Sequence, residues 1–420
     1  MNFETFFSAF QGIQAMLASP PHMVWARIGL ILLGFLLVYL GRKGVLDPLL
    51  MIPMGLGMSV INASVMIFDP LKMRTGANGE PGLGTLFVEA QAGASENLVQ
   101  NAADMIYILG IDWLQPIYTF TFSNGLIACL VFLGIGALLD VGFLMARPFM
   151  SITIALFAEI GTLITFPIAT LFGYNIKQAA AISTIGGADG PMVLFTSLQL
   201  APELFVPIAI IAYLYLAFAY GGYPYLIRFM IPSKKIRGTP MKPDTSTNKI
   251  SSGQKMAFAI VACVVLCFLL PVASPLLFSL FLGIVIRESG IKPFQDLVTG
   301  PLLYCSTLFL GLMLGVLCEA TTILDPKVLP LLILGVLALL LSGIGGITGG
   351  YLFWLFSGKK INPVIGIAGV SCIPTTAKVA QKVVQKDNPQ AIVMQFALGA
   401  NVMGVITSAI IAGVFCSLLK

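Results

Sequence analysis

Long apolar runs, almost free of charged residues, alternate along the chain with short polar stretches. Such runs cover residues 24–40, 148–172, 204–220, 256–270, 328–356 and 391–419. They reach or approach the roughly 20 residues with which a helix crosses a hydrocarbon layer. Solid runs favour helices, because membrane strands would alternate apolar and polar positions and close into a barrel. With shorter interrupted segments added, the pattern predicts an all-α polytopic membrane protein of roughly 10 to 12 membrane segments.

The polar stretches divide the chain. Residues 1–23 are expected to form an amphipathic segment near the membrane surface, because Glu4 stands where a signal peptide would have a basic start. Residues 232–255 form a basic linker, which the positive-inside bias places in the cytoplasm. This linker separates a first membrane repeat, 24–231, from a second, 256–420. The polar loop 69–115 within the first repeat is richer in Asp and Glu than in Lys and Arg and is assigned to the outer side.

Composition agrees with a membrane setting and narrows the chemistry. Hydrophobic residues make up 58% of the chain and charged residues 10%, far from the balance of a soluble domain. We expect the lipid bilayer as a partner, and no nucleic acid. The seven cysteines form no CxxC pair and the chain has one histidine, so buried free thiols are expected instead of a zinc site.

A weak internal repeat links the two halves. Residues 132–134 read Phe-Leu-Gly and precede Pro191 by a distance similar to that between the Phe-Leu-Gly at 309–311 and Pro374. Each pair brackets a long helix followed by a glycine-rich interrupted segment. Corresponding broken helices in two halves are typical of a transporter site, and an inverted pair of repeats is a common arrangement. We therefore predict two repeats, each with one broken helix.

The first broken segment places a carboxylate beside a helix break. Its backbone freedom comes from Gly186, Gly187 and Gly190, while Pro191 removes a hydrogen-bond donor. Carbonyl groups freed by such a break can bind a cation, and Asp189 adds the full negative charge that suits Na⁺. A carboxylate in the bilayer is a functional hypothesis by default. The alternative is that Asp189 only caps the helix that follows.

The second broken segment extends over residues 362–378, around Gly366, Gly369 and Pro374. It offers neutral oxygens that could complete a cation shell, from Asn362, Ser371, Thr375 and Thr376. Taken alone, its small residues fit helix packing equally well. Its position opposite the first break favours the cation site.

Two further polar positions stand near the breaks. Lys378 lies about one turn beyond Pro374 and is a candidate for holding an anionic substrate, whereas Lys382 and Lys386 fit a solvated helix end. Tyr213 and Tyr215 lie inside an apolar run, where tyrosine is commonly an anchor or core residue. Only one of the two need be functional.

Four segments together resemble the β subunit of the sodium-pumping biotin-dependent decarboxylases, which act on oxaloacetate, methylmalonyl-CoA, glutaconyl-CoA and related substrates. These are the Ile-Gly-Gly-Ala-Asp-Gly-Pro at 185–191, the Tyr-Leu-Tyr at 213–215, and the segments 362–378 and 399–408. The resemblance extends from about Val24 over nearly the whole chain. It is weakest in the polar loop 69–115.

The resemblance implies a membrane subunit, a translocase, that removes CO₂ from carboxybiotin and couples this step and the consumption of a proton to Na⁺ export. It implies roles in Na⁺ binding and coupling for Asp189, Asn362, Ser371 and Asn401, with Gly366 in the same segment. The family assigns Tyr215 there as well. A hydroxyl at Ser371 or Tyr215 could pass the proton. We hypothesise that Na⁺ at Asp189 and release of this proton exclude each other.

The resemblance also implies partners. The biotin is carried by a carboxyltransferase α subunit, not by this chain, and a small single-span γ- or δ-type subunit completes the complex. The β subunits are expected to associate with one another in the cytoplasmic membrane of a prokaryote. The partner's transferase selects the primary substrate, so residues of this chain do not identify it.

Two positions depart from the family pattern. Lys378 replaces the usual arginine, and a lysine offers a point charge where arginine would grip a carboxylate with a planar fork. Ala400 replaces a common proline before Asn401. Two other functions remain open from the residues alone: a gradient-driven secondary sodium symporter or antiporter, and a purely structural anchor for a decarboxylase complex.

Overall fold

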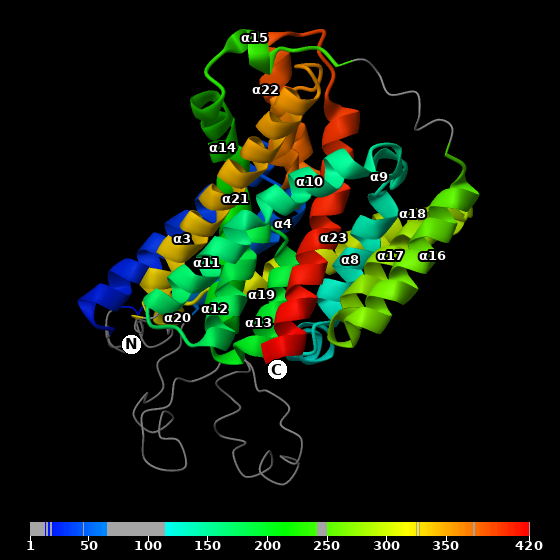
Figure 1. Ribbon diagram of the computed structural model, residues 1–420. Coiled ribbons are helices and arrows are strands. Elements are labelled where there is room, and N and C mark those ends of the chain that lie inside the picture. Colours follow the sequence, from blue (N-terminus) through cyan, green and yellow to red (C-terminus); the bar gives the residue numbers. More distant parts are fainter. Residues whose placement is uncertain are drawn as a thin grey trace, which may run out of the picture. The chain divides into compact units, whose positions relative to one another are not determined.

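The computed structural model describes residues 13, 16, 19–44, 46–64, 114–241, 250–324, 326, 328–372 and 374–419 (Figure 1). Most of the predicted N-terminal segment 1–23, nearly all of the polar loop 69–115 and residues 242–249 of the linker lie outside them. The described residues form helices and contain no strand. Seven of these helices are long and apolar enough to cross a membrane, or eight if the bent pair Pro202–Tyr215 and Ala219–Met230 counts as one span. The prediction of an all-α polytopic membrane protein is confirmed.

The helices separate into two compact units, interleaved along the chain. The first comprises the residues up to 126 together with 307–325, and the second comprises 127–306 and 326–420. The two-repeat division at the linker concerns internal sequence similarity and stays a prediction.

The first unit is built on two packed helices, α3 (Pro21–Arg42) and α4 (Pro48–Ala63). Close approach is possible because Gly34 faces the Gly55 carbonyl, where a side chain on Gly34 would collide. Ser59 donates a hydrogen bond to the Gly55 oxygen at 2.8 Å. Asn62 donates to the Cys318 oxygen at 2.9 Å, which ties the end of α4 to the last residues of the unit. The unit also holds α7 (Gln115–Ile117), η3 (Tyr118–Phe122), most of α19 (Leu303–Leu317), from Thr307 onward, and α20 (Ala320–Ile323).

The second unit contains the remaining helices. In chain order they are α8 (Leu126–Leu138), α9 (Gly142–Ala146), α10 (Pro148–Ala158), α11 (Ile160–Leu171), α12 (Ile176–Ser183), η4 (Thr184–Gly187), α13 (Gly190–Leu200), η5 (Pro202–Leu204), α14 (Phe205–Met230), α15 (Lys234–Arg237), α16 (Ser252–Leu269), η7 (Pro271–Ala273), α17 (Ser274–Glu288), α18 (Lys292–Leu297), η8 (Val298–Leu302), the first turn of α19, α21 (Val328–Phe356), η9 (Pro363–Gly369), α22 (Thr375–Asp387) and α23 (Met394–Leu419).

The long helix α21 organises this unit, and Figure 1 shows it running beside α10 and α11. One face of α21 carries small residues, and the backbones of its neighbours press against them. A side chain on Gly345 would collide with the Phe157 carbonyl, and one on Gly346 or Gly350 would collide with carbonyl groups of η9. Small residues serve this purpose in membrane helices because they let backbones approach closely.

Candidate functional site

The first broken segment has the predicted interruption. Helix α12 ends at Ser183, a single 3-10 turn (η4) follows, and α13 begins at Gly190. Ala188 has a φ of 55°, in the left-handed region, and this residue turns the chain between the two helices. Asp189 then occupies the N-cap position of α13. The Met192 backbone N–H faces its carboxylate, but the geometry falls short of a capping hydrogen bond.

The second broken segment meets the first one at its break. Helix η9 ends at Gly369, Val370 is extended, and α22 begins at Thr375. Between these helices Ser371 binds the Gly187 carbonyl twice, with its backbone N–H at 3.1 Å and its hydroxyl at 2.5 Å. The structure therefore joins two segments that are 184 residues apart, both interrupted, and both buried.

A glutamate that the sequence analysis did not single out lies beside this junction. Glu159 connects α10 to α11 and is 2% exposed. Its Oε2 accepts a hydrogen bond from Thr162 Oγ1 at 2.7 Å, and its Oε1 accepts one from Ser408 Oγ. Ser408 Oγ lies 3.2 Å from Ser371 Oγ. Polar contacts thus lead from Glu159 through Ser408 and Ser371 to the Gly187 carbonyl, with the Ser408 hydroxyl donating to Glu159 and the Ser371 hydroxyl donating to Gly187.

Asn401 of α23 is held from one side only. Its amide nitrogen donates to the carbonyl oxygens of Ala368 and Val370 and to Thr376 Oγ1, at 3.0–3.1 Å. Its amide oxygen is buried without a hydrogen-bond partner. A buried carbonyl oxygen without a partner loses the hydrogen bonds that it had in water. Asn401 Oδ1 is therefore a candidate cation ligand, held in place by the second broken segment.

The two tyrosines of α14 face different surroundings. The ring of Tyr213 lies against Gly190, where an added Cβ would collide with it, and Tyr213 interacts electrostatically with Asp189. The Tyr213 hydroxyl is buried without a hydrogen-bond partner. Tyr215 instead donates a hydrogen bond of 2.6 Å to the Leu332 carbonyl of α21. The structure therefore places Tyr213 beside Asp189, whereas the Tyr215 ring lies against Gly335 of α21.

Asn362 and Lys378 lie in other surroundings. Asn362 is fully buried, and its oxygen accepts from the Val364 backbone N–H while its nitrogen donates to the carbonyl oxygens of Arg237 and Thr239. Its polar atoms are thus occupied by the linker and by η9. Lys378 is exposed in the first two turns of α22. Neither residue has a contact with the Asp189 group among the hydrogen bonds of the described residues.

The glycines of both breaks sit where backbones nearly touch. Gly186 packs against Thr162 and Ser342, and Gly366 packs against the Gly346 carbonyl of α21. Gly369 packs against the Ile154 carbonyl of α10 in the same way. These residues position the two breaks against α10, α11 and α21. The neighbouring Pro374 lies half-buried, directly ahead of α22.

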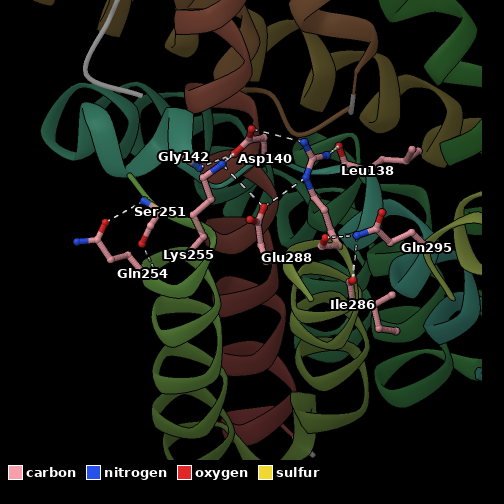
Figure 2. A network of polar contacts seen from close by, with 10 residues as sticks. Leu138, Asp140, Gly142, Ser251, Gln254, Lys255, Ile286, Glu288 and Gln295 are labelled. Atoms are coloured by element: carbon pink, nitrogen blue, oxygen red, sulfur yellow. Dashed lines mark hydrogen bonds and ion pairs between the residues drawn. The ribbon is translucent and has the colours of Figure 1, made fainter. Parts of the chain in front are cut away.

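Two clusters of charged residues connect helix ends within the second unit. In the first, shown in Figure 2, Asp140 accepts from Lys255 at 2.7 Å, and Lys255 also lies 3.9 Å from Glu288. Arg287 bridges Asp140 and Glu288 at 3.5 and 3.4 Å. Burial raises the pKa of Asp140, but the hydrogen bonds from Lys255 and the Gly142 backbone outweigh it, so that the pKa lies below its ordinary value. This cluster links the end of α8 to α16 and α17.

The second cluster fastens the linker. Arg237 is buried and donates to Asp387 Oδ2 at 2.6 Å and to the Pro232 carbonyl at 2.9 Å. Asn388 donates to the Gly238 carbonyl at 2.9 Å. Since Asn362 binds the same stretch, residues 231–239 are tied both to the start of η9 and to the end of α22.

We expect Asp387→Asn to lower the melting temperature at pH 7, and to lower it by less in acid. The Arg237 hydrogen bond holds the pKa of Asp387 below its ordinary value of 3.8. A depressed carboxyl pKa contributes stability above that ordinary value, and the contribution is lost as the pH falls through the lower folded value. The expected cost at pH 7 is about 1 kcal/mol. Thermal unfolding at pH 7 and near pH 3 tests this; an equal difference at both pH values would contradict the role of the ionised pair.

Comparison with known proteins identifies close relatives over the whole length. The family described as "Na+-transporting oxaloacetate decarboxylase beta subunit" matches residues 26–419. A Malonomonas rubra protein named "Carboxybiotin decarboxylase" is 52% identical over 416 residues, which cover 99% of each chain. The "Oxaloacetate decarboxylase beta chain 2" of Salmonella typhi is 33% identical, over 94% of this chain and 95% of its own. The "Methylmalonyl-CoA decarboxylase subunit beta" of Veillonella parvula is 35% identical, over 69% of this chain and 77% of its own.

Proposed function

This chain belongs to the family of Na⁺-transporting oxaloacetate decarboxylase β subunits, and from that premise we propose how its two broken segments bind Na⁺ and use carboxybiotin. As a member it is the membrane subunit of a Na⁺-transporting decarboxylase. The proposals concern the ion ligands, the proton path, the delivered group and the partners.

We propose that Na⁺ binds at the junction of the two breaks, with Asp189 as its charged ligand and the Asn401 oxygen as a neutral one. Na⁺ is a hard cation that oxygen ligands suit, and both groups are buried oxygens. The observation that carries this proposal is the double hydrogen bond from Ser371 to the Gly187 carbonyl, which joins the break beside Asp189 to the segment that Asn401 binds. Ser371 belongs to the same site. Asn362 then supports it from a distance, by anchoring the start of η9.

Carboxybiotin delivered by a partner is the proposed substrate, in keeping with the name of the Malonomonas rubra relative. Loss of CO₂ breaks the bond between carbon and the ureido nitrogen, and the electron pair stays on nitrogen, which then takes up a proton. A site that excludes water favours this step, because it disfavours the carboxylate of the substrate. The hydroxyls of Ser371 and Tyr213 are candidates for passing the proton. We propose that Lys378, which is exposed, attracts the anionic group as it approaches.

The partners follow from the same premise. We propose that a biotin-bearing carboxyltransferase α subunit and a small single-span subunit assemble with this chain in the cytoplasmic membrane of a prokaryote. The names of its relatives as β chains support a complex of several subunits. Association of β subunits with one another stays a prediction.

The function can be tested with the purified chain in proteoliposomes, using synthetic carboxybiotin as the substrate and ²²Na⁺ as the tracer. We expect Na⁺-dependent release of CO₂ and uphill Na⁺ movement that begins only when carboxybiotin is added. Na⁺ uptake driven by a gradient alone, without any effect of carboxybiotin, would instead indicate a secondary transporter. Purification from the native host and detection of a biotinylated partner with streptavidin is the matching test of the complex.

A further inference from the structure

The outer face of α22 is polar, although this helix begins directly after a buried break. Its exposed residues are Lys378, Lys382, Gln385 and Lys386. The three lysines follow at four-residue spacing, so they form a row along one side of the helix, about 12 Å long. The membrane span α16, by contrast, exposes apolar side chains such as Val264 and Phe268. A row of lysines is costly against hydrocarbon, so the outer face of α22 meets water.

Basic residues of α14 and α15 lie beside the far end of this row. Arg228 and Lys234 are close enough to Asp387, at the end of α22, to affect its carboxyl electrostatically. The Lys382 ammonium lies 5.4 Å from the centre of the Tyr220 ring of α14. Figure 1 shows α15 beside the end of α22. We define the basic surface as Arg228, Lys234, Lys382 and Lys386.

Acidic side chains do not balance this basic surface. Residues 219–241 and 374–390 contain seven arginines and lysines but one acidic residue, Asp387. The carboxylate of Asp387 is occupied, because it accepts a hydrogen bond of 2.6 Å from the buried Arg237. The other basic side chains therefore leave a net positive field at this end of the second unit. Such a field favours an acidic partner and speeds its encounter with the surface.

We propose that the basic surface is the docking site for an acidic face of the biotin-bearing partner, and that docking there brings carboxybiotin to the start of α22. This inference rests on the proposed function, in which carboxybiotin arrives attached to a partner. Lys378 lies at the end of the lysine row nearer the break, about one turn from Pro374. A carrier held at the other end of the row therefore delivers its group along the water-facing side of α22.

Anionic lipid headgroups are the competing occupant of the basic surface. Headgroups attract basic residues at the plane of the membrane surface, and this attraction falls off within a Debye length. The lysine row, however, continues from Lys386 for about two helical turns toward the break. A soluble acidic partner fits a row of this direction better than a layer of headgroups does.

The test compares carboxybiotin attached to its carrier with free carboxybiotin. The carrier is the biotin-bearing subunit that co-purifies with this chain, carboxylated before use, and the double variant is Lys382→Glu with Lys386→Glu in proteoliposomes. At an ionic strength of about 20 mM, we expect the variant to raise the KM for the carrier at least about tenfold, with kcat unchanged. Choline chloride at about 0.5 M, with Na⁺ held constant, should reduce this difference. Turnover of free carboxybiotin should not change.

Matched variants separate charge from structure. Lys382→Arg with Lys386→Arg keeps both charges and should leave the KM for the carrier low. Lys292→Glu reverses an exposed charge on α18 and should affect neither substrate. If the charge-reversed protein does not fold, Lys382→Gln with Lys386→Gln removes the charges without reversing them and should raise the KM for the carrier about threefold.

An unchanged KM for the carrier, or an equal rise for free carboxybiotin, would overturn the inference. An effect on both substrates in vesicles that contain phosphatidylglycerol, but not in phosphatidylcholine alone, would also overturn it, because the surface would then bind lipid headgroups. Co-sedimentation of the carrier with proteoliposomes measures docking without turnover. If the unaltered chain releases CO₂ from neither substrate, the proposed function is wrong, whereas co-sedimentation that the charge reversal does not weaken contradicts the docking site.

Discussion

Asp189→Asn is expected to abolish Na⁺-dependent decarboxylation of carboxybiotin. The substitution keeps the shape of the side chain and removes its charge from a site that is 6% exposed. At an effective dielectric constant of about 20, a unit charge about 4 Å from Na⁺ contributes about 4 kcal/mol. Losing it lowers Na⁺ affinity by about a thousandfold. The measurement is the Na⁺ activation curve of CO₂ release in proteoliposomes.

The control for this experiment is Asp296→Asn, which removes the same charge from an exposed position on α18. We expect an unaltered activation curve there, because exposed charges of this kind contribute little. If Asp189→Asn retained Na⁺-stimulated decarboxylation, Asp189 would not be the charged ligand.

The helices and the two breaks were predictable from the sequence because both follow from local chemistry. Apolar runs of membrane length predict helices, and the run 328–356 coincides with α21. Glycine and proline inside such runs predict interruptions, which the structure has at η4 and at η9. Only the meeting of the two breaks, where Ser371 binds the Gly187 carbonyl, depends on a tertiary contact.

The identities of some site residues depend on which side of a helix faces the site. The local sequence pattern does not predict this orientation. Tyr213 and Tyr215 are two positions apart, so they point about 200° apart around α14. Local pattern does not tell which one faces Asp189. Asn362 likewise resembles an ion ligand until its partners, Arg237 and Thr239, are known. Those partners lie more than a hundred positions away in the chain.

Glu159 shows a different reason for a missed residue. It is the only charged side chain of the run 148–172, and this run is so apolar that its length alone suffices to predict a membrane helix. The charge of Glu159 could have identified it, because an ionisable residue inside a membrane span suggests function even without a neighbouring helix break. Helix α10 ends and α11 begins at this residue, so the glutamate marks a third irregular point in the same unit.

Gly366→Ala is expected to destabilise the second unit and to remove transport. A Cβ on Gly366 would overlap the Gly346 carbonyl oxygen and would lie 2.9 Å from the Gly350 backbone nitrogen. Both obstacles are backbone of α21, which cannot rotate away as a flexible side chain would, so η9 must shift. Overpacking of this kind costs about 1–3 kcal/mol or more. Because Asn401 binds the Ala368 and Val370 carbonyls directly after Gly366, the shift also displaces a proposed ion ligand.

Thermal unfolding and the Na⁺ activation curve separate these two effects of Gly366→Ala. The matched control is Gly221→Ala, because Gly221 lies in α14 with open space where its Cβ would be. There alanine is expected to stabilise the helix by about 0.5–1 kcal/mol and to leave Na⁺ activation unchanged. A loss of stability with normal Na⁺ activation in the surviving Gly366→Ala protein would mean that the position of η9 does not govern the ion site. Loss of transport without a change in stability would mean that a small displacement of η9 is enough to disturb the ion ligands. The contact between η9 and α21 would then determine the affinity for Na⁺.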